Sequence, residues 1–339
     1  MKKFFSMVAL LVLSLVIAVP AFAANSESYI VADIDGHWAQ PEIDNFINAD
    51  LIKGKYVDSD GYTHFDPNGN MTRSEFVVAL VQIAGLTTDL PGKIFEDVRE
   101  NLWYTNQIRI ASALGIANGV DATHFGVSQK ITRAEMATMI VKAFEAKKSI
   151  AFSTGTTKFT DVPQFYATEY IGKAYNTGLI SGTSATTFSP SQWATRAQVI
   201  VVLNHAVMKE NSSLPTEDEL FNVINSALKD QVDSINSGQI DFHLDKYFTG
   251  YGMAPQVDSM DYINEMINEG LQFKAEIVSA EQFKVSKISD RFAVVESTGG
   301  NIKITTSYQD ETYEDTESLD GSYYLIKVGD TWKIYNEEY

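Results

Sequence analysis

The sequence predicts a multidomain protein in which an all-α unit of three tandem repeats is followed by an α+β domain. Three observations support this prediction. The chain of 339 residues is too long for a single hydrophobic core. One residue pattern, with fixed internal offsets, occurs three times in the first two thirds of the chain. Beyond the third copy, the apolar residues change from a helical period to the period of two that is typical of strands.

The first residues have the features of an export signal. Lys2 and Lys3 precede an apolar run over residues 4–19, and Ala-Phe-Ala at residues 21–23 is a small-residue cleavage site. An uncleaved membrane anchor is the alternative, but the run is short for a membrane span and ends at Pro20. We therefore expect a signal peptide over residues 1–23 and a secreted mature protein with no membrane span.

Composition excludes several classes of site and partner. The chain has no cysteine, so disulfides, thiolate metal sites and cysteine catalysis are absent. Its formal net charge is −18, and most of this charge lies beyond residue 212, where 9 basic residues face 24 acidic ones. Such a surface repels nucleic acid and anionic membranes, so we expect neither as a partner.

Each repeat contains an Asp, an aromatic residue, an Ile five residues later, a Gly eleven residues after the Ile, and a Thr-Arg motif. We place the repeats at residues 29–88, 93–150 and 157–208. The repeated positions are Asp33, Asp97 and Asp161; Trp38, Trp103 and Tyr166; Gly54, Gly119 and Gly182; and Arg73, Arg133 and Arg196. So many shared offsets indicate a true internal repeat.

Each copy is predicted to form a helix, a loop and a second helix. Gly115 and Gly178 lie where the first helix would end in the left-handed conformation, and Asp50 takes that place in the first copy. The second helix is predicted to begin with a capping box, in which a Thr side chain and the residue three positions later cap each other. The pairs are Thr72 and Glu75, Thr132 and Glu135, and Thr195 and Gln198.

The capping box does not explain the arginine at the first position of each second helix. A cation is mildly disfavoured there by the helix dipole, whereas free N–H groups at a helix start suit an anion. One interpretation is that Arg73, Arg133 and Arg196 bind an anionic ligand. The alternative is that each pairs with an acidic neighbour, for which Asp33, Asp97 and Asp161 are the candidates.

The aromatic and glycine positions also allow two interpretations. Trp38, Trp103 and Tyr166 have flat faces that could stack on sugar rings, although a lone aromatic at a helix start is more often a core residue. Gly54, Gly119 and Gly182 could allow close backbone approach to a ligand, or could simply form turns.

The pattern Asp-Val, Trp-Ala, Ile, Gly and Ile-Thr-Arg-Ala-Glu resembles the S-layer homology domain over roughly residues 29 to 208. The resemblance implies a pseudo-threefold helical module that binds secondary cell wall polysaccharide in grooves between the repeats. The polymer often ends in pyruvylated N-acetylmannosamine, whose carboxylate would meet the arginine. It also implies a location at the bacterial cell wall or S-layer surface, with the Arg, Asp, aromatic and Gly positions given above as glycan-binding residues.

The copies differ, so we expect unequal grooves. The third copy has Tyr166 where the others have Trp, and Gln198 in place of Glu, and we expect the groove that uses Tyr166 to be the weaker one. The first copy has a longer loop over residues 55–64. Asp58-Ser-Asp-Gly in that loop is interpreted as a turn, because Gly69 stands where a calcium loop needs Glu.

The last third is predicted to be an α+β domain over residues 215–339, after a linker at residues 209–214. Two helical stretches, the first opening at Pro215 and the second ending at Gly270, precede strands at 273–280, 283–288, 292–297, 301–308, 322–328 and 331–335. Helices followed by a meander indicate helices on one face of a curved antiparallel sheet. This order resembles the NTF2-like or cystatin-like architecture.

We find no catalytic motif in this domain and expect no cofactor and no metal. His243 lies between Asp241 and Asp245, but it is interpreted as a surface residue, and residues 311–320 with five acids as a solvated loop. We therefore expect a non-enzymatic wall-anchored protein whose C-terminal domain binds itself, another protein or a small ligand. The alternative is a wall-anchored hydrolase or isomerase, for which a carboxylate pair in a deep pocket would be evidence.

Overall fold

The computed structural model describes residues 29–339, which form two compact units. The expected signal peptide lies outside the described residues. Val31–Phe46 and Leu51–Ser213 form the repeat unit, and Leu214–Tyr339 forms most of the other unit, to which Ile47–Asp50 also belongs. Among residues 29–339, no helix has the length and apolar character needed to cross a membrane. The architecture is that of a multidomain protein of helices and antiparallel sheets.

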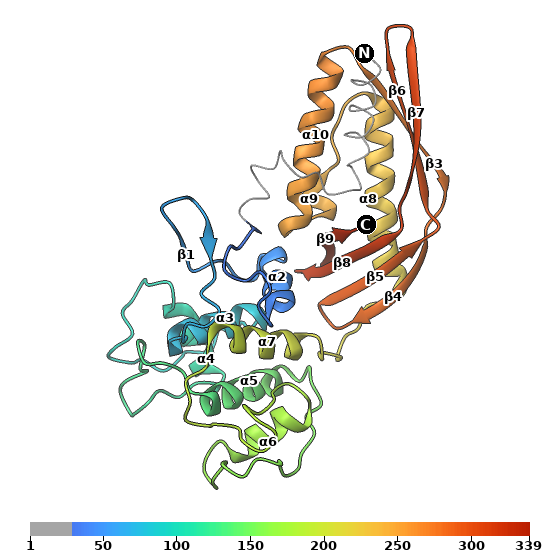
Figure 1. Ribbon diagram of the computed structural model, residues 1–339. Helices are drawn as coiled ribbons and strands as arrows, with labels where there is room; N and C mark the ends of the chain where they lie inside the picture. The colour runs from blue at the N-terminus through green and yellow to red at the C-terminus, as the bar shows by residue number, and fades with distance from the viewer. Residues whose placement is uncertain (1–28) are drawn as a thin grey trace. The chain divides into compact units, whose positions relative to one another are not determined.

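The repeat unit contains two helices per repeat, as the sequence predicts (Figure 1). The first helices are α2 (Gln40–Asn48), α4 (Thr105–Ala113) and α6 (Thr168–Asn176), and the second helices are α3 (Arg73–Ile83), α5 (Arg133–Lys147) and α7 (Arg196–Val207). A hairpin of β1 (Tyr56–Val57) and β2 (Thr63–His64) occupies the longer loop of the first repeat. Within it, Asp58 accepts hydrogen bonds from the backbone N–H groups of Asp60 and Tyr62, so the predicted turn is confirmed.

The predicted helix ends are confirmed. All three capping boxes are complete, so each second helix begins at its arginine. Asp50, Gly115 and Gly178 adopt the left-handed conformation, with φ of 56°, 70° and 74°.

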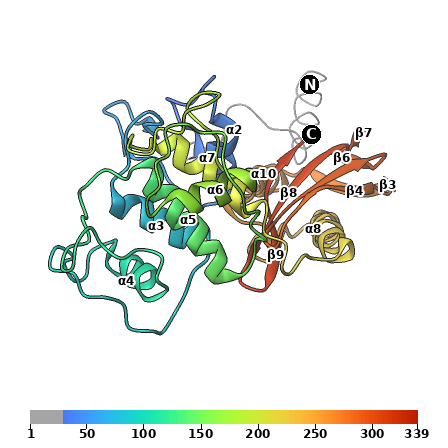
Figure 2. The same cartoon turned by 90° about the horizontal axis from the view of Figure 1, so that it is seen from below.

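The three second helices form the centre of the repeat unit. α3, α5 and α7 contact one another, and α4 packs against α3 as α6 packs against α5. Figure 2 shows α3, α5 and α7 close together, with α4 at the periphery. The helices are apolar on nearly all sides, which suits a buried position.

The C-terminal unit has helices on one side of two antiparallel sheets (Figure 1). Its helices are α8 (Glu217–Ser237), α9 (Leu244–Tyr247) and α10 (Met253–Asn268), with a 3-10 turn, η3 (Gly250–Gly252). One sheet has the order β3 (Gln272–Ser279), β6 (Asn301–Tyr308), β7 (Glu311–Ser318), and the other the order β4 (Gln282–Ile288), β5 (Phe292–Thr298), β8 (Gly321–Val328), β9 (Thr331–Glu338). One apolar cluster lies beneath each sheet, and residues of α8 belong to both.

One sequence-based interpretation of this unit is wrong. The acidic stretch predicted as a solvated loop contains β7, which pairs with β6 from Asn301 opposite Ser318 to Tyr308 opposite Glu311. The strand lies at the edge of its sheet and most of its side chains are exposed. An edge strand of this kind tolerates acidic residues because they stay in water.

Candidate functional site

The starts of the three second helices form a closed ring of backbone hydrogen bonds. The amide of Met71 donates to the carbonyl of Ala194 at 3.2 Å, the amide of Ala194 to Ile131 at 2.9 Å, and the amide of Ile131 to Met71 at 3.0 Å. Each of these residues immediately precedes a capping threonine. The ring therefore brings all three Thr-Arg motifs to one centre.

The N–H groups at these helix starts are engaged within the chain. The amides of Arg73, Arg133 and Arg196 donate to the carbonyls of Gln129, Gln192 and Gly69, each in another repeat, at 2.8, 2.8 and 2.9 Å. The amide two residues later in each helix donates to its own capping threonine. The expectation of free N–H groups waiting for an anion is wrong, because the neighbouring repeat takes the place of that anion.

The three arginine side chains join one repeat to another in the same way. The guanidinium carbons of Arg73, Arg133 and Arg196 lie 5.1, 4.7 and 4.5 Å from the ring centroids of Phe125, Phe188 and Phe65. Each Nε also donates to the carbonyl of that same phenylalanine, at 3.1, 2.8 and 2.7 Å. A planar cation that stacks and donates at once is a role that arginine fills and lysine does not.

Burial makes these arginines part of the framework. Arg73 is 2% exposed and pairs with Glu135 at 2.5 Å, while Arg133 is 4% exposed and donates to the carbonyl of Ser181 at 2.8 Å. Burial lowers the pKa of Arg133 to about 10, and the charge of Asp161 opposes this shift. The acidic partner of Arg73 is thus a glutamate of the next repeat's capping box, which the sequence did not suggest.

The repeated aspartates bind the backbone amides of the same phenylalanines. Asp33, Asp97 and Asp161 accept hydrogen bonds from the amides of Phe65, Phe125 and Phe188, at 2.7, 2.7 and 2.8 Å, and from the amide that follows each. Desolvation raises the pKa of Asp161, but these backbone hydrogen bonds and the charge of Arg133 outweigh it, so the pKa is lowered.

The repeated glycines lie where the chain passes close to itself. A Cβ at Gly119 would meet the carbonyl of His124 and the ring of Phe95, and one at Gly182 would meet the carbonyl of Thr187 and the ring of Phe159. Gly119 also has a φ of 81°, which only glycine adopts freely. Gly54 is similarly close to Thr63 and the carbonyl of His64.

The repeated aromatics are exposed, so the view that a lone aromatic here is a core residue is wrong. Trp38, Trp103 and Tyr166 are 61%, 58% and 62% exposed. Trp193, which the sequence analysis did not single out, is 55% exposed. Exposed aromatic faces on a folded unit are candidates for ligand contact.

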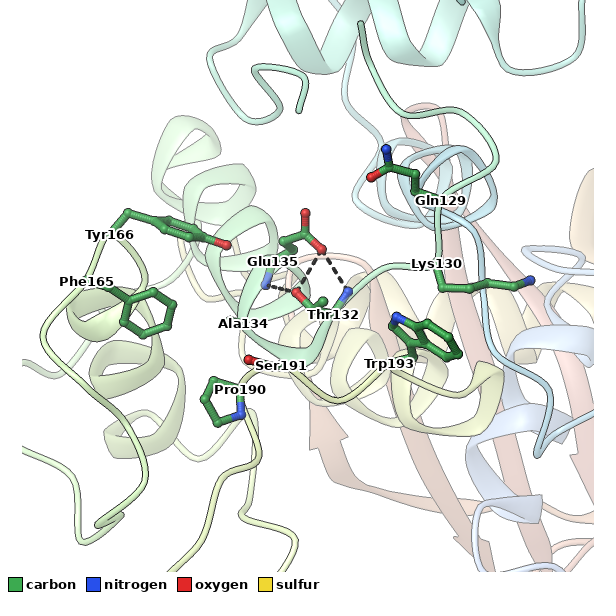
Figure 3. A pocket seen from close by; sticks show the side chains of 10 residues that line it. All are labelled: Gln129, Lys130, Thr132, Ala134, Glu135, Phe165, Tyr166, Pro190, Ser191 and Trp193. Atoms are coloured by element: carbon green, nitrogen blue, oxygen red, sulfur yellow. Dashed lines mark hydrogen bonds between the residues drawn. The ribbon is translucent and has the colours of Figure 1, made fainter. Parts of the chain in front are cut away.

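A cavity of about 600 Å³ lies between the second and third repeats. Figure 3 shows Tyr166 on one side of it and Trp193 on the other, with Thr132 and Glu135 between them. The remaining lining residues are Gln129, Lys130, Ala134, Phe165, Pro190 and Ser191. The cavity therefore combines two exposed aromatic faces with polar groups, as saccharide sites require.

The polar groups of this cavity are held in place. Oε2 of Glu135 accepts from the amide and hydroxyl of Thr132, both at 2.8 Å, and Nζ of Lys130 donates to the carbonyl of Asn70 at 3.0 Å. Partial desolvation and the charge of Glu135 raise the pKa of the Tyr166 hydroxyl, which the charge of Arg73 opposes. Tyr166 is thus a neutral hydrogen-bonding group at neutral pH.

Comparison with known proteins gives this repeated geometry a family. The sequence profile of the S-layer homology domain matches residues 94–137 and 158–200, in the second and third repeats. These two segments are S-layer homology domains. This confirms the resemblance found in the sequence, and it indicates a secreted protein of the cell surface.

Curated relatives match part of the chain at modest identity. The chain is 27% identical over 183 residues to exoglucanase XynX of Acetivibrio thermocellus, covering 53% of this chain and 16% of the relative. It is 28% identical over 212 residues to the surface-layer 125 kDa protein of Lysinibacillus sphaericus, covering 61% and 17%. It is 28% identical over 148 residues to the cellulosome-anchoring protein of A. thermocellus, covering 42% and 33%. The chain spans a third or less of the length of these relatives.

Comparison with solved structures gives a neighbour of low similarity. The intermembrane space region of the chloroplast protein ARC6 has a TM-score of 0.30 at 16% identity, covering 37% of this chain and 97% of that one. This score is too low to assign a fold family.

The C-terminal unit also contains two glutamates, Glu281 and Glu337, that accept hydrogen bonds from polar side chains. Oε1 of Glu281 accepts from the hydroxyls of Ser297 and Tyr323, at 2.5 and 2.9 Å, and Glu337 accepts from Gln256 at 2.9 Å. Burial raises the pKa of Glu281 and raises that of Glu337 to about 7. His243, in contrast, is an exposed side chain with Asp230 and Asp241 nearby at 3.9 and 3.8 Å. Within residues 29–339, no group of three or more His, Asp or Glu side chains is placed to hold a metal.

Proposed function

We propose that this protein attaches non-covalently to the bacterial cell surface by binding secondary cell wall polysaccharide through its three S-layer homology repeats. The proposed ligand is an anionic glycan end, of which pyruvylated N-acetylmannosamine is the best candidate. The cavity between Tyr166 and Trp193 is the observation that carries this proposal, because it joins two exposed aromatic faces to a polar floor. The relatives named for surface layers and for cellulosome anchoring support it.

The grooves rather than the buried arginines are the proposed contact surface. Arg73 and Arg133 are almost fully buried and occupied by partners of the next repeat. The cationic charge of Arg73 still lies close to the groove, because Arg73 pairs with Glu135 of the groove lining and its charge opposes the raised pKa of Tyr166. We propose that the arginines position the groove walls and lend positive potential, while Trp38, Trp103 and Tyr166 contact sugar.

A sedimentation assay with cell wall sacculi of the producing bacterium tests this function. The mature protein should bind intact sacculi and fail to bind sacculi from which hydrofluoric acid has removed the secondary polymer. Mild acid treatment, which hydrolyses the pyruvate ketal, should weaken binding if the carboxylate is recognised. Equal binding to intact and stripped sacculi would contradict the proposal.

We further propose that the C-terminal unit is an NTF2-like domain that is displayed at the surface and binds a ligand, a protein or a second copy. The long helices α8 and α10 on one side of two antiparallel sheets support this assignment. Light scattering of the full mature chain over a range of concentrations tests self-association. A molar mass that stays that of the monomer at all concentrations would exclude self-association and leave another protein or a ligand as the partner of this unit.

A second candidate function is a wall-anchored hydrolase or isomerase, for which Glu281 and Glu337, held among hydrogen-bonding side chains, are the candidate acid–base groups. A carboxyl group with a pKa near 7 suits general acid catalysis at neutral pH. The matched test measures sugar or peptide released from sacculi by the wild-type chain and by Glu337→Gln. Release that both proteins lack, or share equally, excludes this candidate for that substrate.

A further inference from the structure

One position of the repeat differs in kind among the three copies. It lies two residues before the capping threonine and is Asn70 in the first repeat, Lys130 in the second and Trp193 in the third. At each of these positions the backbone forms a bridge to the threonine of another repeat: Asn70 to Thr195, Lys130 to Thr72, and Trp193 to Thr132. The three side chains therefore occupy equivalent places at the junctions between repeats.

The fold does not require tryptophan at this position. Asn70 and Lys130 form the equivalent backbone bridges although their side chains are polar, so the bridge does not depend on an aromatic side chain. Trp193 is 55% exposed, so most of its ring is not used in packing. A large aromatic residue that is half in water, where sister repeats have Asn and Lys, indicates contact with something outside the chain.

The surroundings of Trp193 specify the chemistry of that contact. The indole and the Tyr166 ring line one cavity from opposite sides, with the Thr132 and Glu135 pair between them (Figure 3). Flat rings stack on the apolar faces of sugars, and polar groups between them can hydrogen-bond hydroxyls. Two stacking faces suit a saccharide of at least two rings. Lys130, exposed in the same lining, places a cation at the edge of the groove, where its Nζ donates to the carbonyl of Asn70.

We propose that Trp193 is a specificity-determining residue that stacks on a second sugar ring of an anionic saccharide, and that the Tyr166–Trp193 groove is the principal glycan site. This inference rests on the proposed wall-binding function. It reverses the ranking expected from sequence, in which the groove with Tyr166 is the weaker one. A sugar bound there contacts Tyr166 with one ring and Trp193 with the next.

The variant Trp193→Asn tests this inference, because it introduces the residue that the first repeat carries at the equivalent position. Binding of the full mature chain to intact sacculi is measured as a dissociation constant by sedimentation. Trp193→Asn should weaken binding about tenfold, since a central aromatic contact contributes a large share of affinity. Trp193→Tyr should restore most of it. Tyr62→Asn, an aromatic residue of similar exposure (61%) outside this cavity and outside the proposed sugar contacts, is the matched control and should leave binding unchanged.

The outcomes separate this inference from the proposed function. Wild-type protein that fails to bind intact sacculi overturns both. Wild-type binding with an unchanged dissociation constant for Trp193→Asn overturns only the role of Trp193. A loss that Trp193→Tyr does not restore, together with a lower unfolding temperature, shows a structural role and also overturns it. Tenfold weakening with an unchanged unfolding temperature and rescue by tyrosine supports it.

Discussion

The guanidinium of Arg133 lies 4.7 Å above the ring of Phe188 and donates from Nε to the carbonyl of the same residue at 2.8 Å. Asp161 accepts the amide of Phe188 at 2.8 Å, so one phenylalanine is bound at its ring, its carbonyl and its amide. The same arrangement joins Arg73 to Phe125 and Arg196 to Phe65. The arginine repeated in the sequence is therefore a joint between repeats, and the exposed surface lies beside it.

Replacing Arg133 by alanine should destabilise the repeat unit. The change leaves the carbonyls of Phe188 and Ser181 without their side-chain donor and removes the cation from the Phe188 ring. We expect a loss of about 2 to 4 kcal/mol in the free energy of unfolding, measured by urea denaturation followed by circular dichroism. Arg99→Ala, an exposed arginine of the same repeat, is the control and should change stability little. Equal stability of the two variants would show that the joint contributes nothing.

If the arginines hold the repeats together, arginine variants are poor probes of glycan binding. A combined Arg73→Ala and Arg133→Ala variant should lose binding because it unfolds, so its loss would not measure a contact between arginine and ligand. Exposed aromatic positions are the better probes, because they can be changed without opening the core.

Features that depend on local chemistry were predictable from sequence. The helix starts followed from the capping boxes, and the left-handed helix ends followed from Asp50, Gly115 and Gly178. Both signals involve residues within a few positions of each other. The arginine joints were not predictable, because Arg133 and Phe188 are 55 residues apart and their contact exists only when the ring of repeats closes.

Trp193 and strand β7 could not be predicted from the sequence. Trp193 escaped notice because alignment emphasises positions that agree among the copies, and this position reads Asn, Lys and Trp. β7 was hidden by its acidic residues, although Thr312, Tyr313 and Thr316 are typical of strands. Trp193 and most side chains of β7 are exposed, so the spacing of buried apolar residues does not identify them.

Replacing Gly119 by alanine should separate the structural from the ligand-binding interpretation of the repeated glycines. The φ of 81° costs alanine about 1 to 2 kcal/mol, and its Cβ would press on the carbonyl of His124 and the ring of Phe95. We expect at least that loss in urea denaturation. Gly115→Ala is the comparison, because Gly115 has a similar φ of 70° but open space around the added Cβ. If both variants lose the same stability, the close approach at Gly119 is unimportant.

The repeat unit should lose stability in acid. The pKa values of Asp97 and Asp161 are lowered in the folded state, because backbone hydrogen bonds to their carboxylates outweigh desolvation. A lowered folded pKa gives stability that is present above the unfolded value near 4 and is lost as the pH falls through the folded value. Asp161→Asn should be less stable than wild type at pH 7 and should show a weaker loss between pH 5 and pH 2. The unfolding temperature is measured by tryptophan fluorescence at each pH, in chains that carry Trp332→Phe so that only tryptophans of the repeat unit contribute to the signal. If the unfolding temperatures of the two proteins fall in parallel as the pH falls, the assignment to Asp161 is contradicted.

The C-terminal unit should show the opposite dependence on pH. Burial, with the charge of Glu281 adding to it, raises the pKa of Glu337 to about 7 from an ordinary value of 4.5. The folded state therefore binds more protons than the unfolded state between these values, so this group's stabilising contribution is full below about pH 4.5 and falls as the pH rises through 7. The difference is on the order of 3 kcal/mol. A variant in which Trp38, Trp103 and Trp193 are replaced by Phe leaves Trp332 as a fluorescent reporter of this unit. Urea denaturation of that variant at pH 5 and pH 8 should give the higher stability at pH 5, and adding Glu337→Gln should remove most of the difference. An unchanged difference in the glutamine variant would assign the effect to another group, with Glu281 the next to replace.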